Sequence, residues 1–186
     1  DGGAGADTLT GGSGADAIDG GAGDDVLTGG GGADVLDGGD GSDQVAQSSD
    51  SDQTLTDSTL DDATLANIES AQLTGGDSAN TIDASGFSGS VTIDGGAGDD
   101  VLTGGAGSDV IDGGDGSDEV RSSADADQTL TDTALGADTL AGIERAQLTG
   151  GDSANTIDAS GFSGSATISG GAGDDVLTGG AGSDLI

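Results

Sequence analysis

The chain has 186 residues, 36 of them acidic and only 2 basic, which gives a formal net charge of −34 at pH 7. This balance excludes binding to nucleic acid and to anionic membrane surfaces, because both need a basic patch. The absence of His and Cys excludes a disulfide framework and the usual ligands of zinc and copper. No stretch is apolar enough for a signal peptide or a membrane-inserted helix.

Residues 2–46 consist of nine-residue repeats in unbroken register, with the pattern Gly-Gly-x-Gly-x-Asp-x-apolar-x. The glycines can adopt the positive φ angles of a tight turn, and the last three residues suffice for one short strand. An acidic composition with few aromatic residues is typical of disorder, but a strict repeat favours a solenoid. The sixth position of the five copies carries Asp7, Asp16, Asp25, Asp34 and Asp43.

Residues 47–94 form a different segment, which we expect to be a set of β-helix coils poor in metal. Its first part, residues 47–74, contains no glycine, and strands joined by wider turns are the favoured prediction there. A short helical turn at residues 62–68 is the alternative. Two weakened repeats follow, with Asn80 and Val91 at the sixth position, and Phe87 is expected to fill the core where a metal turn has been lost.

The rest of the chain repeats this organisation with a longer, 75-residue period, which takes Gly20 to Gly95 and then to Gly170. Residues 95–121 hold three regular copies with Asp100, Asp109 and Asp118, and residues 122–169 correspond to the first metal-poor segment. Residues 170–186 hold two copies with Asp175 and Asp184. We therefore expect one continuous all-β solenoid over residues 1–186. Because Asp1 and Ile186 fall inside repeats, we also expect the sequence to be a segment of a longer protein.

The sixth-position carboxylates predict a metal requirement. Stacked coils lie about 4.8 Å apart, and two bare charges at about that distance repel by about 3 kcal/mol at an effective dielectric constant of 20. Calcium would cancel this repulsion, because it accepts six to eight oxygen ligands in flexible geometry, whereas magnesium requires a strict octahedron. We expect several calcium ions bound with Kd values of about 10⁻⁴ to 10⁻³ M, and a chain that folds only outside the cell.

The repeated pattern resembles the RTX, or haemolysin-type, calcium-binding repeat, in ten copies that cover about half of the chain. The resemblance implies a right-handed parallel β-roll or β-helix without substantial helix, two repeats per coil, and export by type I secretion. It also implies calcium between successive turns on one edge, with Asp7 paired to Asp25, Asp16 to Asp34, Asp25 to Asp43, and Asp100 to Asp118. Asp109 and Asp184 have no downstream partner in the pattern, and Asn80, Val91, Asn155 and Ala166 depart from it.

The expected function is structural rather than enzymatic. We expect a stalk, fibre, surface-layer or adhesin scaffold of a secreted or cell-surface protein, with calcium as its partner and self-association into fibres or layers left open. Asp24 and Asp25 resemble paired catalytic carboxylates, but adjacent residues point in different directions. Two alternatives are a secretion and folding module of an exported enzyme or toxin, and an ice-binding or carbohydrate-binding module.

Overall fold

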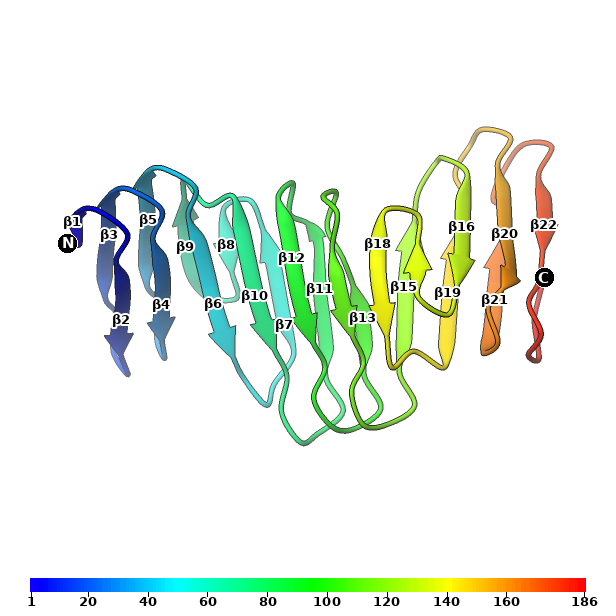
Figure 1. Ribbon diagram of the computed structural model, residues 1–186, viewed down its shortest axis with the longest axis horizontal. Coiled ribbons are helices and arrows are strands. Elements are labelled where there is room, and N and C mark those ends of the chain that lie inside the picture. The colour runs from blue at the N-terminus through cyan, green and yellow to red at the C-terminus, as the bar shows by residue number, and fades with distance from the viewer.

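The computed structural model describes all 186 residues and contains 22 strands and no helix. The strands form two sheets of eleven that face each other across a narrow core (Figure 1). The first sheet contains, in spatial order, β1 (Gly3–Ala4), β3 (Ala17–Ala22), β5 (Val35–Asp40), β9 (Ala63–Ala66), β8 (Thr59–Leu60), β7 (Gln53–Thr56), β11 (Thr81–Gly86), β13 (Val101–Thr103), β15 (Glu119–Ser123), β19 (Arg145–Thr149) and β21 (Ser165–Ser169).

The second sheet contains, in spatial order, β2 (Thr8–Gly12), β4 (Val26–Gly30), β6 (Gln44–Ser48), β10 (Ser70–Thr74), β12 (Ser90–Asp94), β14 (Val110–Asp112), β18 (Asp138–Ala141), β17 (Ala134–Leu135), β16 (Gln128–Thr131), β20 (Thr156–Gly161) and β22 (Val176–Thr178). No helix in the structure is long and apolar enough to cross a bilayer.

Each nine-residue repeat supplies one short strand, and successive repeats alternate between the two sheets. Strands two repeats apart therefore pair in parallel within one sheet, as Leu9 pairs with Leu27 and Ile18 with Leu36. A coil consists of one strand from each sheet and the two glycine turns that connect them. The prediction of a parallel β-roll with two repeats per coil is confirmed.

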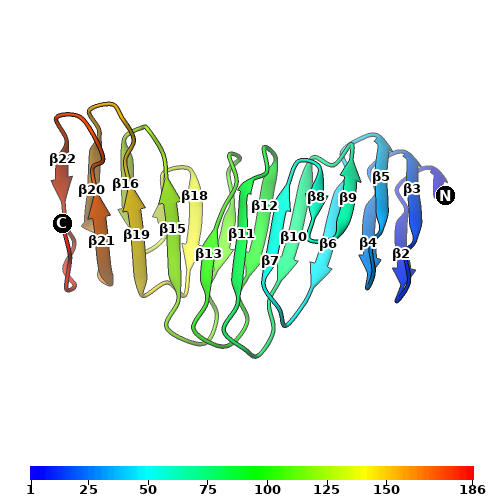
Figure 2. The ribbon, with the colours of Figure 1, turned by 180° about the vertical axis from the view of Figure 1, so that it is seen from behind.

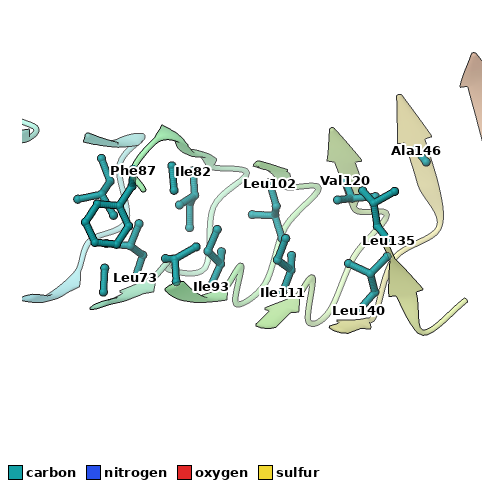
Figure 3. Packing of buried hydrophobic residues seen from close by; sticks show 14 of the residues in the cluster. Leu73, Ile82, Phe87, Ile93, Leu102, Ile111, Val120, Leu135, Leu140 and Ala146 are labelled. Atoms are coloured by element: carbon teal, nitrogen blue, oxygen red, sulfur yellow. The ribbon is translucent and has the colours of Figure 1, made fainter. Parts of the chain in front are cut away.

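The core consists of apolar side chains that point inward from both sheets and face each other, and 26 buried residues form one cluster (Figure 3). Because side chains alternate across a strand, each regular repeat contributes one apolar side chain to this core, that of its eighth residue. Burial of one such side chain contributes about 1.5–3 kcal/mol. Phe87 and Phe162 are each 1% exposed, which confirms that they are core residues.

The segments without glycine turns form a feature that the sequence did not predict. Strands β7, β8 and β9 make an antiparallel meander, in which Leu55 faces Leu60 and Leu60 faces Ala63. The meander then rejoins the parallel sheet, since β9 pairs with β5 and β7 pairs with β11. The helical alternative at residues 62–68 is wrong, because Ala63–Ala66 is a strand. The expected further strands are present, but two-residue turns join them, so the prediction of wider turns is wrong. The strands run antiparallel because such connections are too short for a parallel crossover.

A second meander, β16–β18, occupies the equivalent position in the next 75-residue unit, but in the other sheet. From β7 to β16 the chain passes between the sheets an odd number of times, so each unit begins on the opposite face. The two meanders consequently lie on opposite sides of the solenoid. Figure 1 views β16–β18 from their own side, and Figure 2 gives the view from behind.

Candidate metal sites in the glycine turns

The glycine turns stack closely on one another along the two edges of the solenoid. Gly21 and Gly23 have φ angles of 103° and 125°, a region that side chains rarely tolerate. A Cβ atom at either position would also collide with the main-chain oxygen of Gly3 or Gly5 in the preceding coil. Glycine is therefore required here both by the turn conformation and by the contact between neighbouring turns.

The sixth-position aspartates form ladders along these edges. The main-chain N–H of Asp7 donates to Oδ1 of Asp25 at 2.7 Å, and the N–H of Asp25 donates to Oδ1 of Asp43 at 2.8 Å. Two more links of the same kind join Asp16 to Asp34 at 2.9 Å and Asp100 to Asp118 at 2.8 Å. The structure thus brings together the four pairs that the repeat pattern implies.

The second oxygen of these carboxylates has no partner within the protein. Asp25 is 1% exposed, and its Oδ2 atom is buried and accepts no hydrogen bond. The same holds for Oδ2 of five other aspartates, namely Asp7, Asp43, Asp100, Asp109 and Asp118. A buried and unpartnered carboxylate oxygen is costly, so each of these atoms is suited to contact with a cation.

A main-chain oxygen faces the same small space as the unpartnered carboxylate. A Cβ atom on Gly20, the first glycine of its repeat, would lie 2.5 Å from Asp25 Oδ2 and 2.5 Å from the carbonyl oxygen of Gly38 in the next coil. The corresponding Cβ on Gly95 would meet Asp100 Oδ2 and the Gly113 carbonyl at the same two distances. The first glycine therefore leaves open a cradle lined by oxygen atoms, which we call the first-glycine cradle.

The set of ligand atoms suits a hard cation. No three acidic side chains converge on one point, so an ion would be held by two carboxylates at most and completed by main-chain carbonyls. Oxygen-only ligands of this kind fit calcium, and the chain has no nitrogen or sulfur ligands for a softer metal. In the ladder, Asp25 would contribute to the turns on both sides of it.

In two of the weakened repeats an asparagine side chain closes the turn by a hydrogen bond. Asn80 Oδ1 accepts the N–H of Gly76 at 2.9 Å, and Asn155 Oδ1 accepts the N–H of Gly151 at 3.0 Å. Among the regular copies, Asp16 does the same, because its Oδ2 accepts the N–H of Gly12 at 2.7 Å. The oxygen that would face an ion is satisfied internally in these turns.

The metal-poor segments also use aspartates as clamps on neighbouring turns. Asp50 Oδ1 accepts the N–H of Ser78 at 2.9 Å, and Asp57 Oδ1 accepts the N–H of Ser88 at 2.6 Å. The equivalent bonds in the second unit join Asp125 to Ser153 at 2.9 Å and Asp132 to Ser163 at 2.6 Å. These exposed carboxylates thus stabilise coils in which no first-glycine cradle contains an unpartnered carboxylate oxygen.

Burial raises the pKa of four carboxyl groups in the ladders. For each one the largest cause is desolvation, and repulsion from neighbouring acidic residues adds to it; the four are Asp43, Asp100, Asp118 and Asp138. In contrast, hydrogen bonds from Ser153 lower the pKa of the exposed Asp125. The ionised form of these four carboxyl groups is therefore disfavoured, whereas the ionised form of Asp125 is favoured.

Three acidic residues outside the repeat pattern continue the ladders, and sequence reasoning missed them. The N–H of Asp43 donates to Glu69 Oε2 at 2.8 Å, and the N–H of Asp118 donates to Glu144 Oε2 at 3.0 Å. The N–H of Asp109 donates to Asp138 Oδ1 at 2.9 Å, which gives Asp109 the downstream partner that the pattern lacks. A signal was present, since Glu69 and Glu144 are two of only three glutamates and occupy equivalent positions in the two units.

The remaining predicted residues lie in less complete surroundings. Asp34 is 2% exposed, but the residue of the meander that corresponds to Asp138 is Ala63, which offers no carboxylate. Asp175 and Asp184 accept N–H groups from Asn155 and Ala166 at 2.8 and 2.9 Å. These two are only half-buried, because no further turn stacks on them.

The fold and the turns define a class of protein, namely a parallel β-roll whose glycine turns form oxygen-lined cradles for cations. The sequence matches the family described as RTX calcium-binding nonapeptide repeat (4 copies) at residues 1–27, 10–45, 85–120, 94–128 and 160–186. These matches cover more than half of the chain, which therefore belongs to this family and is a calcium-binding repeat protein. No curated protein matches the chain.

Proposed function

We propose that the chain is a calcium-dependent structural segment of a secreted or cell-surface protein, such as a stalk, fibre, surface-layer or adhesin scaffold. The observation that carries this proposal is the ladder of buried Oδ2 atoms without partners, each beside a first-glycine cradle. The expected ligands are the ten sixth-position aspartates, of which only the six named above carry an unpartnered buried Oδ2: Asp7, Asp16, Asp25, Asp34, Asp43, Asp100, Asp109, Asp118, Asp175 and Asp184.

Electrostatics explains why such a segment would fold on calcium binding. The net charge of −34 opposes a compact state, and the raised pKa values of the ladder carboxyls show that burial disfavours their ionised form. Calcium at the cradles would neutralise neighbouring carboxylates and link consecutive coils at once. At the low calcium concentration of a cytosol the same chain would remain unfolded, which is compatible with export before folding.

An elongated scaffold is favoured by the shape of the molecule. The coils add along one direction, and each contacts only its neighbours, so length grows with the number of repeats (Figure 1). The outward positions of the second sheet include Thr28, Gln72, Thr92 and Val110, and this mixed row weighs against a flat ice-binding surface. A secretion and folding module of an exported enzyme or toxin remains the second candidate, because the family match supports calcium-gated folding in either setting.

A calcium titration tests the proposal. Far-ultraviolet circular dichroism of the metal-free chain should show a coil that converts to β structure as calcium is added, and chelation should reverse the change. Small-angle scattering of the calcium-loaded chain should give the profile of a rod. A chain that is fully folded in chelator, with the same scattering profile, would contradict calcium-dependent folding.

A further inference from the structure

The turn at residues 67–69 ends one of the aspartate ladders. It connects strand β9 to strand β10, and it stacks on the glycine turn that contains Gly38 and Asp43. Asn67 has a φ angle of 51°, a left-handed conformation that is rare outside glycine. Ala66 pairs with Asp37 and Ser70 with Gln44, so between these paired positions the turn has three residues, whereas the glycine turn has six.

The short turn offers the same two kinds of oxygen as a nonapeptide turn. Within the ladder, the cradle of Gly20 is bordered by Asp25 Oδ2 and the Gly38 carbonyl. At the end of the ladder, a Cβ on Gly38 would lie 2.6 Å from Asp43 Oδ2 and would collide with the carbonyl oxygen of Asn67. Glu69 Oε2 accepts the N–H of Asp43, as an Asp Oδ1 does elsewhere.

The arrangement recurs in the second unit with different residues. Gly142 has a φ angle of 58°, and its carbonyl oxygen borders the cradle of Gly113. A Cβ on Gly113 would lie 2.7 Å from Asp118 Oδ2, and Glu144 Oε2 accepts the N–H of Asp118 at 3.0 Å. The second unit has Gly142 where the first has Asn67. The features common to the two turns are therefore the left-handed backbone conformation and the glutamate.

The carboxylate that faces each of these cradles is buried and lacks a partner. Asp43 and Asp118 are both 0% exposed, and Oδ2 of each accepts no hydrogen bond. The Asp109 turn differs, because the three atoms nearest to a Cβ on Gly104 include no main-chain oxygen, although Asp138 supplies a carboxylate. Among the turns of Asp43, Asp109 and Asp118, a carboxylate partner and a main-chain carbonyl close to the cradle therefore occur together in only two. These are the turns of Asp43 and Asp118, whose partners are glutamates.

We propose that each three-residue turn, Asn67–Glu69 and Gly142–Glu144, completes a calcium site of its own with the glycine turn beneath it. The ligands from the chain would be the carboxylates of Asp43 and Glu69 in one site, and those of Asp118 and Glu144 in the other, with the overlying carbonyl in each. This inference rests on the proposed calcium-dependent function and adds two ions to those expected from nonapeptides alone.

The two end sites differ in the residue that follows the glutamate. Arg145 Nη2 donates to the carbonyl oxygen of Ser117 at 3.0 Å, beside Asp118, whereas the corresponding residue of the first unit is Ser70. A guanidinium group near the ion opposes its binding and occupies a carbonyl of the turn. The Asp43 and Glu69 site is therefore the tighter of the two, and Arg145→Ser strengthens the other.

The test counts calcium ions on the full chain, with CaCl₂ as the probe, by equilibrium dialysis and by native mass spectrometry. Glu69→Gln and Glu144→Gln should each lower the number of bound ions by one, and the double variant should lower it by two. Glutamine retains an oxygen that can accept the main-chain N–H, so the turn is preserved. The matched control is Glu119→Gln, since Glu119 lies outside the ladders and pairs with Arg121 at 2.6 Å; its ion count should equal that of the wild type.

The outcomes separate this inference from the proposed function. Calcium binding by the wild type with an unchanged ion count in both glutamine variants would overturn the end sites and leave the nonapeptide sites standing. Equal losses in Glu119→Gln would also overturn them, because the effect would then follow net charge. A wild-type chain that binds no calcium would overturn both. Since each single variant leaves the other end site intact, loss of one ion from a folded protein remains measurable.

Discussion

Changing Asp25 to alanine should remove a carboxylate that serves two stacked turns at once. Its Oδ1 accepts the N–H of Asp7 at 2.7 Å, and a hydrogen bond to a charged group contributes about 1.5–3 kcal/mol. At a free calcium concentration of about ten times the Kd of a site, each bound ion adds about 1.4 kcal/mol to stability. Loss of the bond and of two ions predicts a loss of about 4–6 kcal/mol in the free energy of unfolding.

The matched control is Asp24→Ala, one residue earlier. Asp24 is exposed, and its Oδ1 accepts only the N–H of Ser42 at 2.9 Å. Its removal should cost about 0.5–1.5 kcal/mol and no ion. In chelator the metal-free chain is expected to be unfolded, so both variants should give the same coil spectrum as the wild type.

Urea unfolding followed by circular dichroism at millimolar calcium measures the difference between the two variants, and spectra recorded in chelator report the metal-free state. We expect a large gap between the variants with calcium and no gap without it. Equal losses in calcium would refute the assignment of the sixth position as the ligand. A wild-type chain that is folded in chelator, and that Asp25→Ala destabilises there as much as in calcium, would show that the residue acts through packing and hydrogen bonding alone.

Three further predictions test other parts of the molecule. In chelator, the folded state binds protons to the four raised-pKa carboxyls more tightly than the unfolded chain does. Lowering the pH from 7 toward the ordinary value of 3.8 should therefore shift the metal-free chain toward its folded state, seen as a gain of β structure by circular dichroism; an unchanged spectrum would contradict this. Gly95→Ala fills the cradle of Asp100 and should lower the number of bound calcium ions by one. Gly14→Ala should leave this number unchanged, because a Cβ at Gly14 meets nothing within 4 Å. Phe162→Ala should destabilise the fold by about 3–5 kcal/mol in thermal or urea unfolding at saturating calcium without lowering the ion count, and loss of an ion would place Phe162 in a metal site.

The repeat pattern was sufficient to predict the coils and the aspartate ladders. Asp at the sixth position and an apolar residue at the eighth recur with a period that equals half a coil, so stacking two repeats apart follows directly. The turn glycines and the buried row led by Leu27 were predicted for the same reason. In these segments the residue pattern and the stacking of coils have the same period, so the stacking can be inferred from the residue pattern.

The meanders were not predicted, because their leucine spacing matches neither the period of a helix nor the nine-residue period of the solenoid. Leu55, Leu60 and Leu65 are spaced by five, as are Leu130, Leu135 and Leu140. A spacing of five corresponds to short strands joined by two-residue turns, in which each strand buries one leucine. Asp61 supports the tight turn with a φ angle of 51°.

The glutamates of the ladders were missed for a different reason. A search for ligands at fixed spacing finds only residues that keep the spacing, and Glu69 follows Asp43 by 26 positions, whereas Asp43 follows Asp25 by 18. The meander inserts chain length without removing the turn from the stack. The longer side chain of glutamate then reaches the position that aspartate occupies in a regular repeat.

The passage of the meanders from one sheet to the other gives the molecule a symmetry that the sequence does not display. One 75-residue unit is related to the next by a half-turn about the long axis combined with a translation, which is a two-fold screw operation. The sequence repeats after one 75-residue unit, but the arrangement of the outer faces repeats only after two. A label attached at the same position of every unit would therefore appear alternately on opposite faces of the rod.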